Sequence, residues 1–272
     1  MSMSEYLTKL SKENYKITKK YYDMNSGFIF NTAGKNVFII GSSPVLKKQI
    51  KKLKLISEKN NPDNLFIVVD AAYKFCVDQG LKFTYTITTE GLPYLTYYDD
   101  YKTDDKILLA FCGSNTYTLN NFKGKIEFFE YKTDPHERCH IGNKFKGREF
   151  IVGGNVTSSV LGMCYYFGAK NVYLFGNELC YKNKIMTQVF DWHKKTEWWN
   201  KFQAMRTELF RKDGIEEHIK YRGQWTHSGF IHVCEWIEYC QKIFETRFNL
   251  FNCSGGILRI KEKSLREVYK NA

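Results

Sequence analysis

Short runs of apolar residues recur along the chain, and most of them end at a glycine or a polar residue. The clearest runs are Asn36–Ile40 (NVFII), Leu65–Val69 (LFIVV), Ile107–Phe111 (ILLAF) and Asn171–Phe175 (NVYLF). Weaker runs are Thr84–Thr88, Ile126–Phe129, Glu149–Val152 and Phe248–Phe251. Continuous apolar strands of this length are typical of a parallel sheet, because its strands are buried on both faces.

Segments with helical spacing separate these runs. Apolar residues recur every three or four positions in Pro44–Glu58, Ala71–Gln79 and Val156–Phe167, and Gly168 follows the last segment as a helix-ending residue. Strands that alternate with helices indicate a parallel α/β arrangement. We therefore predict an α/β fold with a Rossmann-like, doubly wound, mostly parallel sheet.

The pattern changes after about residue 185, where strands give way to long amphipathic helices. Helices are predicted at Gln188–Lys212 and Ser228–Phe248, with a charged helix at Lys261–Ala272. The polar segment between the two long helices has the composition of a lid or an acceptor loop. We predict an N-terminal extension at 1–35, a nucleotide-binding core at 36–182, and a helical subdomain with a closing strand at 183–272, packed on the same domain.

Composition sets the broad class of protein. The chain has 272 residues, 43% of them hydrophobic, which is enough for a sizeable core without disulfides or metal. It has no run of 18 apolar residues and no apolar leader, so we expect a cytoplasmic protein without a transmembrane segment. The eight cysteines form no Cys-x-x-Cys pair, and His136, Cys139 and His140 lack a second ligand pair, so we predict no metal site.

The charge balance points to anionic partners without selecting one. The net charge is +12, from 41 Lys and Arg against 29 Asp and Glu. A basic surface favours nucleotides, nucleic acid or peripheral contact with an anionic membrane. An AT-rich genome would produce the same spread of lysines, so this interpretation stays open beside the functional one.

The turn after the first strand has residues suited to phosphate binding. Ligands of open α/β sheets bind at the carboxyl ends of the strands. Gly41, Ser42 and Ser43 follow the first strand, and Pro44 suits the first position of a helix that Ser43 would cap. The N–H groups at such a helix start would attract a phosphate.

A second turn, which leads into the helix at Val156–Phe167, contains more residues that are suited to phosphate binding. It contains Gly153, Gly154, Asn155, Thr157 and Ser158. Paired glycines let a ligand approach the backbone, Asn155 can cap the helix, and the hydroxyls can bind phosphate or ribose. We expect Thr157→Ala to leave folding nearly intact and to weaken nucleotide binding by about 1–2 kcal/mol, with a larger loss for Gly154→Ala.

Polar side chains also follow three other strands. Asp70 comes directly after LFIVV, Glu90 follows TYTITT, and Asn177-Glu178 follow NVYLF and Gly176. We expect Asp70 and Glu178 to contact the sugar or the base of a nucleotide, and Asn177 to take part in nucleotide binding. Glu90 and Glu178 are the candidate catalytic carboxylates. Asp70 could equally cap the next helix. A histidine suits a general base near neutral pH, and His227 is preferred over His193 because it lies in the polar loop.

These strand ends, in this order, resemble the family of motility accessory factor (Maf) flagellin glycosyltransferases and archaeal 6-hydroxymethylpterin diphosphokinases. The matching segments are IIGSSPVL at 39–46, VVDAAYKF at 68–75, YTITTEG at 85–91 and the long block at 153–179, with a weaker match in FNCSGGILRI at 251–260. The chain departs from the family pattern at Ser42-Ser43-Pro44, where Gly-Pro-Ser is expected. Glu90 replaces Asp, and Asn177-Glu178 replace Gln-Asp.

The resemblance implies a nucleotide-dependent transferase whose nucleophile is an alcohol. The first hypothesis is a glycosyltransferase that moves a sugar, such as a sialic-acid-like nonulosonate, from a CMP- or UDP-linked donor to a hydroxyl on a glycan or a protein. The alternative is an ATP-dependent pterin-type diphosphokinase, which alone would require Mg²⁺.

A third hypothesis is a nucleic-acid-binding or nucleic-acid-modifying transferase, with DNA as the acceptor. It rests on the charge and on basic residues near the predicted tryptophan-rich helix: Lys194, Lys195, Lys201, Arg206, Arg211, Lys212, Lys220 and Arg222.

Overall fold

A computed structural model describes residues 9, 12–14, 16, 29–91, 97–131, 149–181 and 218–271 of the chain. Within these residues, eight parallel strands form one sheet in the order β10-β7-β1-β2-β3-β4-β5-β6. The strands are β1 (Asn36–Ile40), β2 (Asn64–Val69), β3 (Tyr85–Thr88), β4 (Ile107–Phe111), β5 (Lys125–Tyr131), β6 (Glu149–Phe150), β7 (Asn171–Phe175) and β10 (Asn249–Asn252).

Helices connect the strands and cover the sheet. They are α2 (Leu46–Glu58), the 3₁₀ turn η1 (Asp70–Ala72), α3 (Tyr73–Asp78), α4 (Thr116–Asn121), α5 (Val156–Phe167), α7 (Ser228–Phe244) and α8 (Leu265–Asn271). A two-stranded antiparallel hairpin, β8 (Ile219–Tyr221) and β9 (Gln224–Thr226), stands outside the sheet. Among the described helices, none is both long and apolar enough to cross a membrane.

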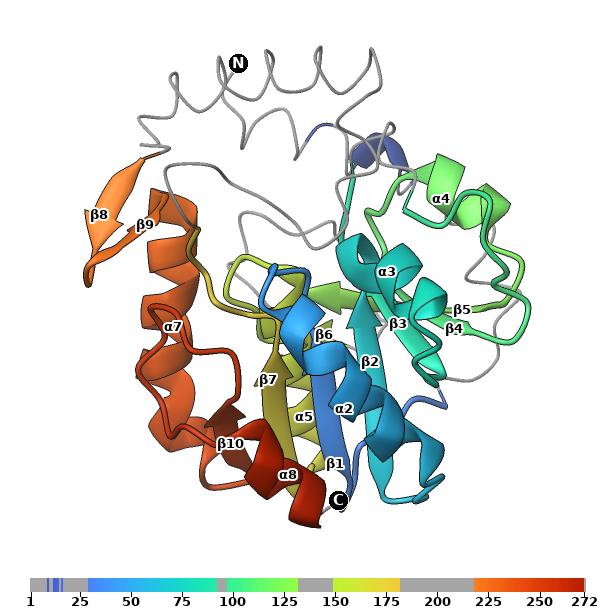
Figure 1. Ribbon diagram of the computed structural model, residues 1–272. Helices are drawn as coiled ribbons and strands as arrows, with labels where there is room; N and C mark the ends of the chain where they lie inside the picture. Colours follow the sequence, from blue (N-terminus) through green and yellow to red (C-terminus); the bar gives the residue numbers. More distant parts are fainter. Residues whose placement is uncertain are drawn as a thin grey trace.

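The sheet is doubly wound. The chain adds β2 to β6 successively on one side of β1 and then returns to place β7 and β10 on the other side. Helices α2 and α3 lie in front of the sheet in Figure 1, with α8 against α2, whereas α5 lies behind it and contacts α7. The predicted fold class is confirmed. The strand order reverses between β1 and β7, and open α/β sheets bind ligands at such a point.

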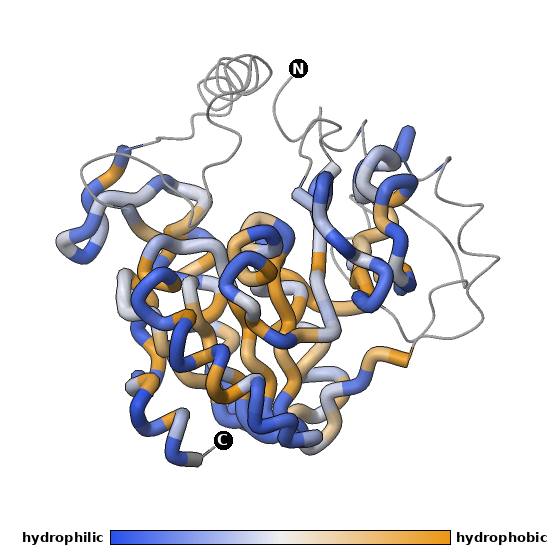
Figure 2. The backbone as a smooth tube through the Cα atoms, turned by 45° about the vertical axis from the view of Figure 1, so that its right-hand side comes forward, coloured by the Kyte–Doolittle hydropathy of each residue, from blue (hydrophilic) through white to orange (hydrophobic). Residues whose placement is uncertain are grey.

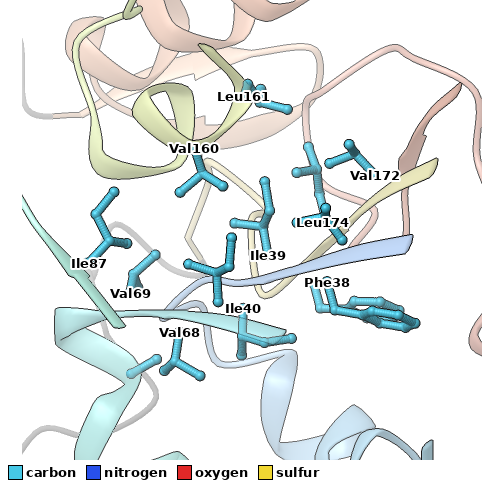
Figure 3. Packing of buried hydrophobic residues seen from close by; sticks show 14 of the residues in the cluster. Phe38, Ile39, Ile40, Val68, Val69, Ile87, Val160, Leu161, Val172 and Leu174 are labelled. Atoms are coloured by element: carbon cyan, nitrogen blue, oxygen red, sulfur yellow. The ribbon is translucent and has the colours of Figure 1, made fainter. Parts of the chain in front are cut away.

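The central strands are buried on both faces, which explains their unbroken apolar runs. Hydrophobic segments fill the middle of the molecule, and polar segments lie along its outer helices (Figure 2). Consecutive residues of β1 point to opposite faces of the sheet. Ile39 points toward Val160 and Leu161 of α5, and Phe38 points away from them (Figure 3). The Phe38 ring stacks on Phe66 of β2, with ring centroids 4.4 Å apart.

A row of asparagine amides crosses the opposite, amino-terminal edge of the sheet. Asn249, Asn171, Asn36 and Asn64 are the first residues of β10, β7, β1 and β2, and they lie in register. Each side-chain Nδ2 donates to Oδ1 of the next residue in that order, at 3.0, 2.7 and 3.1 Å. We call this row the asparagine ladder. It joins four neighbouring strands through one directional chain of hydrogen bonds.

Several elements differ from expectation. Helix α8 begins at Leu265 rather than Lys261. Helix α2 begins at Leu46 rather than Pro44, and its cap position, Val45, has no side-chain cap. The polar loop after residue 213 contains the β8–β9 hairpin, in which Arg222 and Gly223 form the tight turn with positive φ. Helix α7 ends at Phe244, four residues early. The helix predicted at Gln188–Lys212 lies outside the described residues.

Candidate functional site

A pocket of about 360 Å³ opens at the carboxyl edge of the sheet, over the point where the strand order reverses. Its wall combines residues that follow β1, β2, β3 and β7 with the start of α5 and Phe230 of α7. The candidate residues that line the pocket are Gly41, Ser42, Ser43, Asp70, Glu90, Asn155, Thr157 and Asn177. The strand ends selected from the sequence therefore meet around one cavity, of a size typical of ligand sites.

The floor of the pocket depends on a close approach between β1 and β7. The Gly41 N–H donates to the Phe175 carbonyl at 2.7 Å, and Ser43 N–H donates to Gly176 O at 2.9 Å. A Cβ on Gly41 would stand 2.4 Å from the oxygen of Gly176, so only glycine fits there. The glycine that the sequence suggested for a phosphate turn is required first by the packing of the two strand ends.

Asn177 connects the elements below the pocket through its hydrogen bonds. Its Oδ1 accepts a 2.6 Å hydrogen bond from the Thr157 hydroxyl, and its Nδ2 donates to Phe175 O at 2.8 Å. Its backbone N–H donates to the Ser254 hydroxyl, which itself donates to Leu174 O. Asn177 and Thr157 are both buried. Their polar groups therefore serve internal bonds that connect α5, β7 and the turn after β10.

The start of α5 presents backbone N–H groups to the pocket. Asn155 caps the helix as predicted, because its side chain accepts from Ser158 N–H at 2.9 Å, and the Ser158 hydroxyl closes a capping box. Ser158 is fully buried and bonds within the turn. The first N–H groups of a helix have no acceptor within the helix, so those of Val156 and Thr157 are suited to an anion.

The paired glycines before α5 do not line the pocket. A Cβ on Gly153 would lie 2.2 Å from the indole of Trp236 on α7, so this glycine makes room for a tryptophan rather than for a ligand. Gly154 has a φ of +89°, and its Cβ would face His232 and Val233 of α7 at ordinary contact distance. The larger loss of binding expected for Gly154→Ala therefore stays a prediction, since the added Cβ would face α7. The substitution would act through backbone strain.

Asp70 is the buried carboxylate of the site. One of its oxygens accepts from Ala71 N–H and the other from the Thr88 hydroxyl, both at 2.7 Å. Burial raises the pKa of Asp70 from 3.8 to about 6, although the two hydrogen bonds lower it in part. At pH 7 the carboxylate is mainly ionised, and it can take up a proton at little cost. This behaviour suits general acid–base work.

Glu90 lines the pocket beside Asp70, on the loop after β3. Its N–H donates to the Thr88 hydroxyl at 3.2 Å, and its carbonyl accepts from Asn115 N–H at 2.9 Å. The side chain of Asn14 donates to Gly91 O and to Gly113 O, so the N-terminal part of the chain also holds this loop. Two carboxylates thus stand in one wall of the cavity.

Glu178 does not line the pocket but faces the start of α2. Its Oε2 accepts from the Ser43 hydroxyl in a short contact and from Val45 N–H at 3.3 Å. The expected cap by Ser43 is therefore wrong: the Ser43 hydroxyl binds a carboxylate 135 residues away instead of the first turn of the helix. An internal carboxylate occupies the place where a phosphate was expected.

Aromatic residues form the remaining wall, and the candidate set did not include them. Tyr97, Tyr181 and Phe230 line the pocket. Tyr181 pairs with Trp225 of β9 and donates from its hydroxyl to Thr226 O at 2.6 Å. These residues come from three segments distant in sequence, and no local motif marks them. Flat aromatic rings at this wall suit a nucleotide base.

His227 is not among the lining residues. It caps α7, because its Nδ1 accepts from Phe230 N–H at 3.3 Å, and its ring packs on Phe230 with centroids 4.0 Å apart. Nδ1 of His227 thus serves as a helix cap, and its role as a general base stays a prediction. His193, the competing candidate, lies outside the described residues, as do His136, Cys139 and His140. Within the described residues, no group of three or more His, Cys, Asp and Glu side chains is arranged to hold a metal ion.

The charge of the described pocket lining is negative. It contains Asp70 and Glu90 and no Lys, Arg or His. Of the basic residues considered for nucleic acid, only Lys220 and Arg222 are described, and Arg222 forms a bidentate ion pair with Glu238. The interpretation that these residues contact nucleic acid receives no support from the described geometry.

Comparisons with known proteins agree with this architecture. A family model described as 6-hydroxymethylpterin diphosphokinase MptE-like matches residues 6–184. Among solved structures, a MAf glycosyltransferase from Magnetospirillum magneticum AMB-1 aligns with a TM-score of 0.58 and 14% sequence identity, over 93% of this chain and 38% of that one. The chain thus spans less than half of that glycosyltransferase, and the likeness shows a shared fold. No curated protein matches the sequence.

Proposed function

Because the chain belongs to the 6-hydroxymethylpterin diphosphokinase MptE-like family, we propose that it is a transferase that binds an anionic nucleotide donor in the pocket at the carboxyl edge of the sheet. The acceptor is a hydroxyl group. The observation that carries this proposal is the position of Asp70, a carboxylate with a pKa of about 6, in the same cavity as the unfilled N–H groups at the start of α5.

Asp70 and the N–H groups at the start of α5 have complementary roles in a transfer to an alcohol. Asp70 accepts the proton as the acceptor oxygen forms its new bond. The bond between the transferred group and the phosphate oxygen breaks, and the nucleotide leaves with the electron pair. The N–H groups of Val156 and Thr157 stabilise the negative charge on the departing phosphate. Tyr97 and Tyr181 hold the base at the aromatic wall.

We propose that the transferred group is a sugar. The described lining has two carboxylates and no cation, and one helix start supplies about half a unit of positive charge. This electrostatic environment suits a donor with few negative charges, such as a nucleotide sugar linked through CMP or UDP, better than it suits ATP with about four charges. The acceptor would be a hydroxyl on a glycan or a protein.

Diphosphoryl transfer from ATP to a hydroxymethylpterin is the second candidate, favoured by the family description and by the presence of Asp70 and Glu90 in one pocket lining. Mg²⁺ is usually held by one or two carboxylates together with substrate phosphates. The carboxylates of Asp70 and Glu90 fit that requirement. The ion would neutralise the phosphates of ATP there.

One assay separates the two candidates. The protein is incubated with CMP-, UDP- and GDP-sugars, and separately with ATP, Mg²⁺ and 6-hydroxymethylpterin. Release of free nucleotide from a sugar donor supports glycosyl transfer, and its rate should rise with pH through about 6 and be lost in Asp70→Asn. Formation of AMP only in the presence of the pterin supports the diphosphokinase. Absence of both activities and of any nucleotide-induced rise in melting temperature rejects the proposal.

A further inference from the structure

Among the long helices that begin near the pocket, α2 and α5 differ in the charge at their N-termini. Helix α5 is capped by the neutral amide of Asn155. At the start of α2, the carboxylate of Glu178 accepts from the Ser43 hydroxyl and from Val45 N–H at 3.3 Å. Because a helix start has about half a unit of positive charge, a full carboxylate there leaves the start of α2 negative.

The same carboxylate lies at the edge of the cavity. Ser43, which binds it directly, lines the pocket, and so do Asn177 and Leu179 on either side of Glu178 in the chain. The backbone of Glu178 is held firmly, since its carbonyl accepts from Ile257 N–H at 3.1 Å and packs against Gly256, where a Cβ would come within 2.1 Å of the Glu178 oxygen. The carboxylate itself is held at this position by the Ser43 hydroxyl and by Val45 N–H.

We propose that Glu178 is a specificity-determining residue that keeps a second charged phosphate away from the start of α2. The inference rests on the proposed function, because it assumes that a nucleotide phosphate binds at the start of α5. A single phosphate there stays clear of Glu178. A further phosphate group would extend across the pocket toward Ser43 and would meet a carboxylate that already uses the hydroxyl and N–H groups at that position.

The test compares affinities within a nucleotide series. Calorimetric titration with CMP and CDP, and with UMP and UDP, in EDTA gives the ratio of diphosphate to monophosphate affinity. In the parent protein we expect a ratio of one or less. In Glu178→Gln we expect the ratio to rise about tenfold, because the amide keeps the size of the side chain and an acceptor oxygen for Ser43 and Val45 but loses the charge.

Two further variants act as controls. Glu58→Gln makes the same change of charge on α2 at its far end, where Glu58 is exposed, and should leave the ratio at the parent value. Ser43→Ala removes a partner of Glu178 but keeps the charge, and should also leave the ratio low. Thermal melting of each variant shows that it is folded.

The outcomes separate the inference from its premise. If the parent binds nucleotides and Glu178→Gln leaves the ratio unchanged, the inference is overturned while the proposed function stands. An equal rise in Glu58→Gln would also overturn it, because the effect would then come from net charge. If the parent binds no nucleotide at all, the proposed function fails first, and the inference fails with it.

Discussion

The hydroxyl of Thr157 donates a 2.6 Å hydrogen bond to Oδ1 of Asn177, and this buried bond ties the start of α5 to the end of β7. It changes the expected role of Thr157. The sequence suggested a hydroxyl that binds ligand and can be removed without effect on folding, whereas the structure gives that hydroxyl a buried acceptor.

We expect Thr157→Val to lower the free energy of unfolding by about 1–3 kcal/mol, because the buried Oδ1 of Asn177 loses its donor. Thr157→Ser keeps the hydroxyl and should lose much less. Urea denaturation followed by circular dichroism measures both. Equal stability of the Val and Ser variants would show that the hydrogen bond contributes nothing.

Asp70 makes stability depend on pH in an unusual direction. Its pKa is raised to about 6 in the folded protein from 3.8, so the folded state binds the proton more tightly than the unfolded state. The stabilisation that comes from tighter proton binding by Asp70 in the folded state is fully present below pH 3.8. It is lost as pH rises through about 6. Above that pH, the buried charge costs at most about 3 kcal/mol. The free energy of unfolding of Asp70→Asn should therefore increase relative to that of the parent as the pH is raised from 4 to 7. Urea titrations at several pH values measure this difference. A difference that does not vary with pH would contradict this prediction.

Gly153 should be intolerant of a side chain because of Trp236. A Cβ there would stand 2.2 Å from the indole, so Gly153→Ala should destabilise the protein by about 1–3 kcal/mol through overpacking. Trp236→Leu removes the obstruction. The double variant should therefore be more stable than the sum of the two single effects predicts, as measured in a double-mutant cycle. If the two single effects are strictly additive, the loss of stability in Gly153→Ala does not come from contact with Trp236.

The asparagine ladder predicts unequal effects for the same substitution at different strands. Asn36 is central and makes two side-chain hydrogen bonds, to Asn64 and from Asn171, whereas Asn249 makes its ladder bond at the exposed end. Asn36→Ala should cost about 1–3 kcal/mol and Asn249→Ala less than about 1 kcal/mol. Denaturant unfolding of the two variants provides a matched comparison. An equal loss in both would contradict the prediction, because the loss would then not depend on the number of ladder bonds removed.

The strands were the most predictable part of the fold. β1, β4 and β7 have the bounds expected from their apolar runs, because burial on both faces leaves a continuous signal in a single segment. Helix α5 also has its expected bounds, since Asn155 and Gly168 cap it locally. The meeting of the candidate residues at one edge follows from strand direction alone.

The features that the sequence did not predict depend on contacts with residues far away in the chain. The β8–β9 hairpin has a single buried residue, Thr226, and pairs with Tyr181, so its short strands leave no continuous apolar run in the sequence. The role of Gly153 depends on Trp236, and the late start of α2 depends on Glu178. A glycine or serine beside a strand looks the same in sequence whether its neighbour is a ligand or another side chain. Only three-dimensional contacts distinguish these cases.

The position of β10 affects the order in which the molecule can be completed during synthesis. Asn177 is held by Ser254, and Cys253 N–H donates to Leu174 O, although these residues come more than seventy positions later in the chain. A nascent polypeptide emerges from its N-terminus, so β1 to β7 can assemble while this part is still missing. The ribosome must therefore release the turn after β10 before Asn177 gains its last partner, and the contacts below the pocket are completed late in translation.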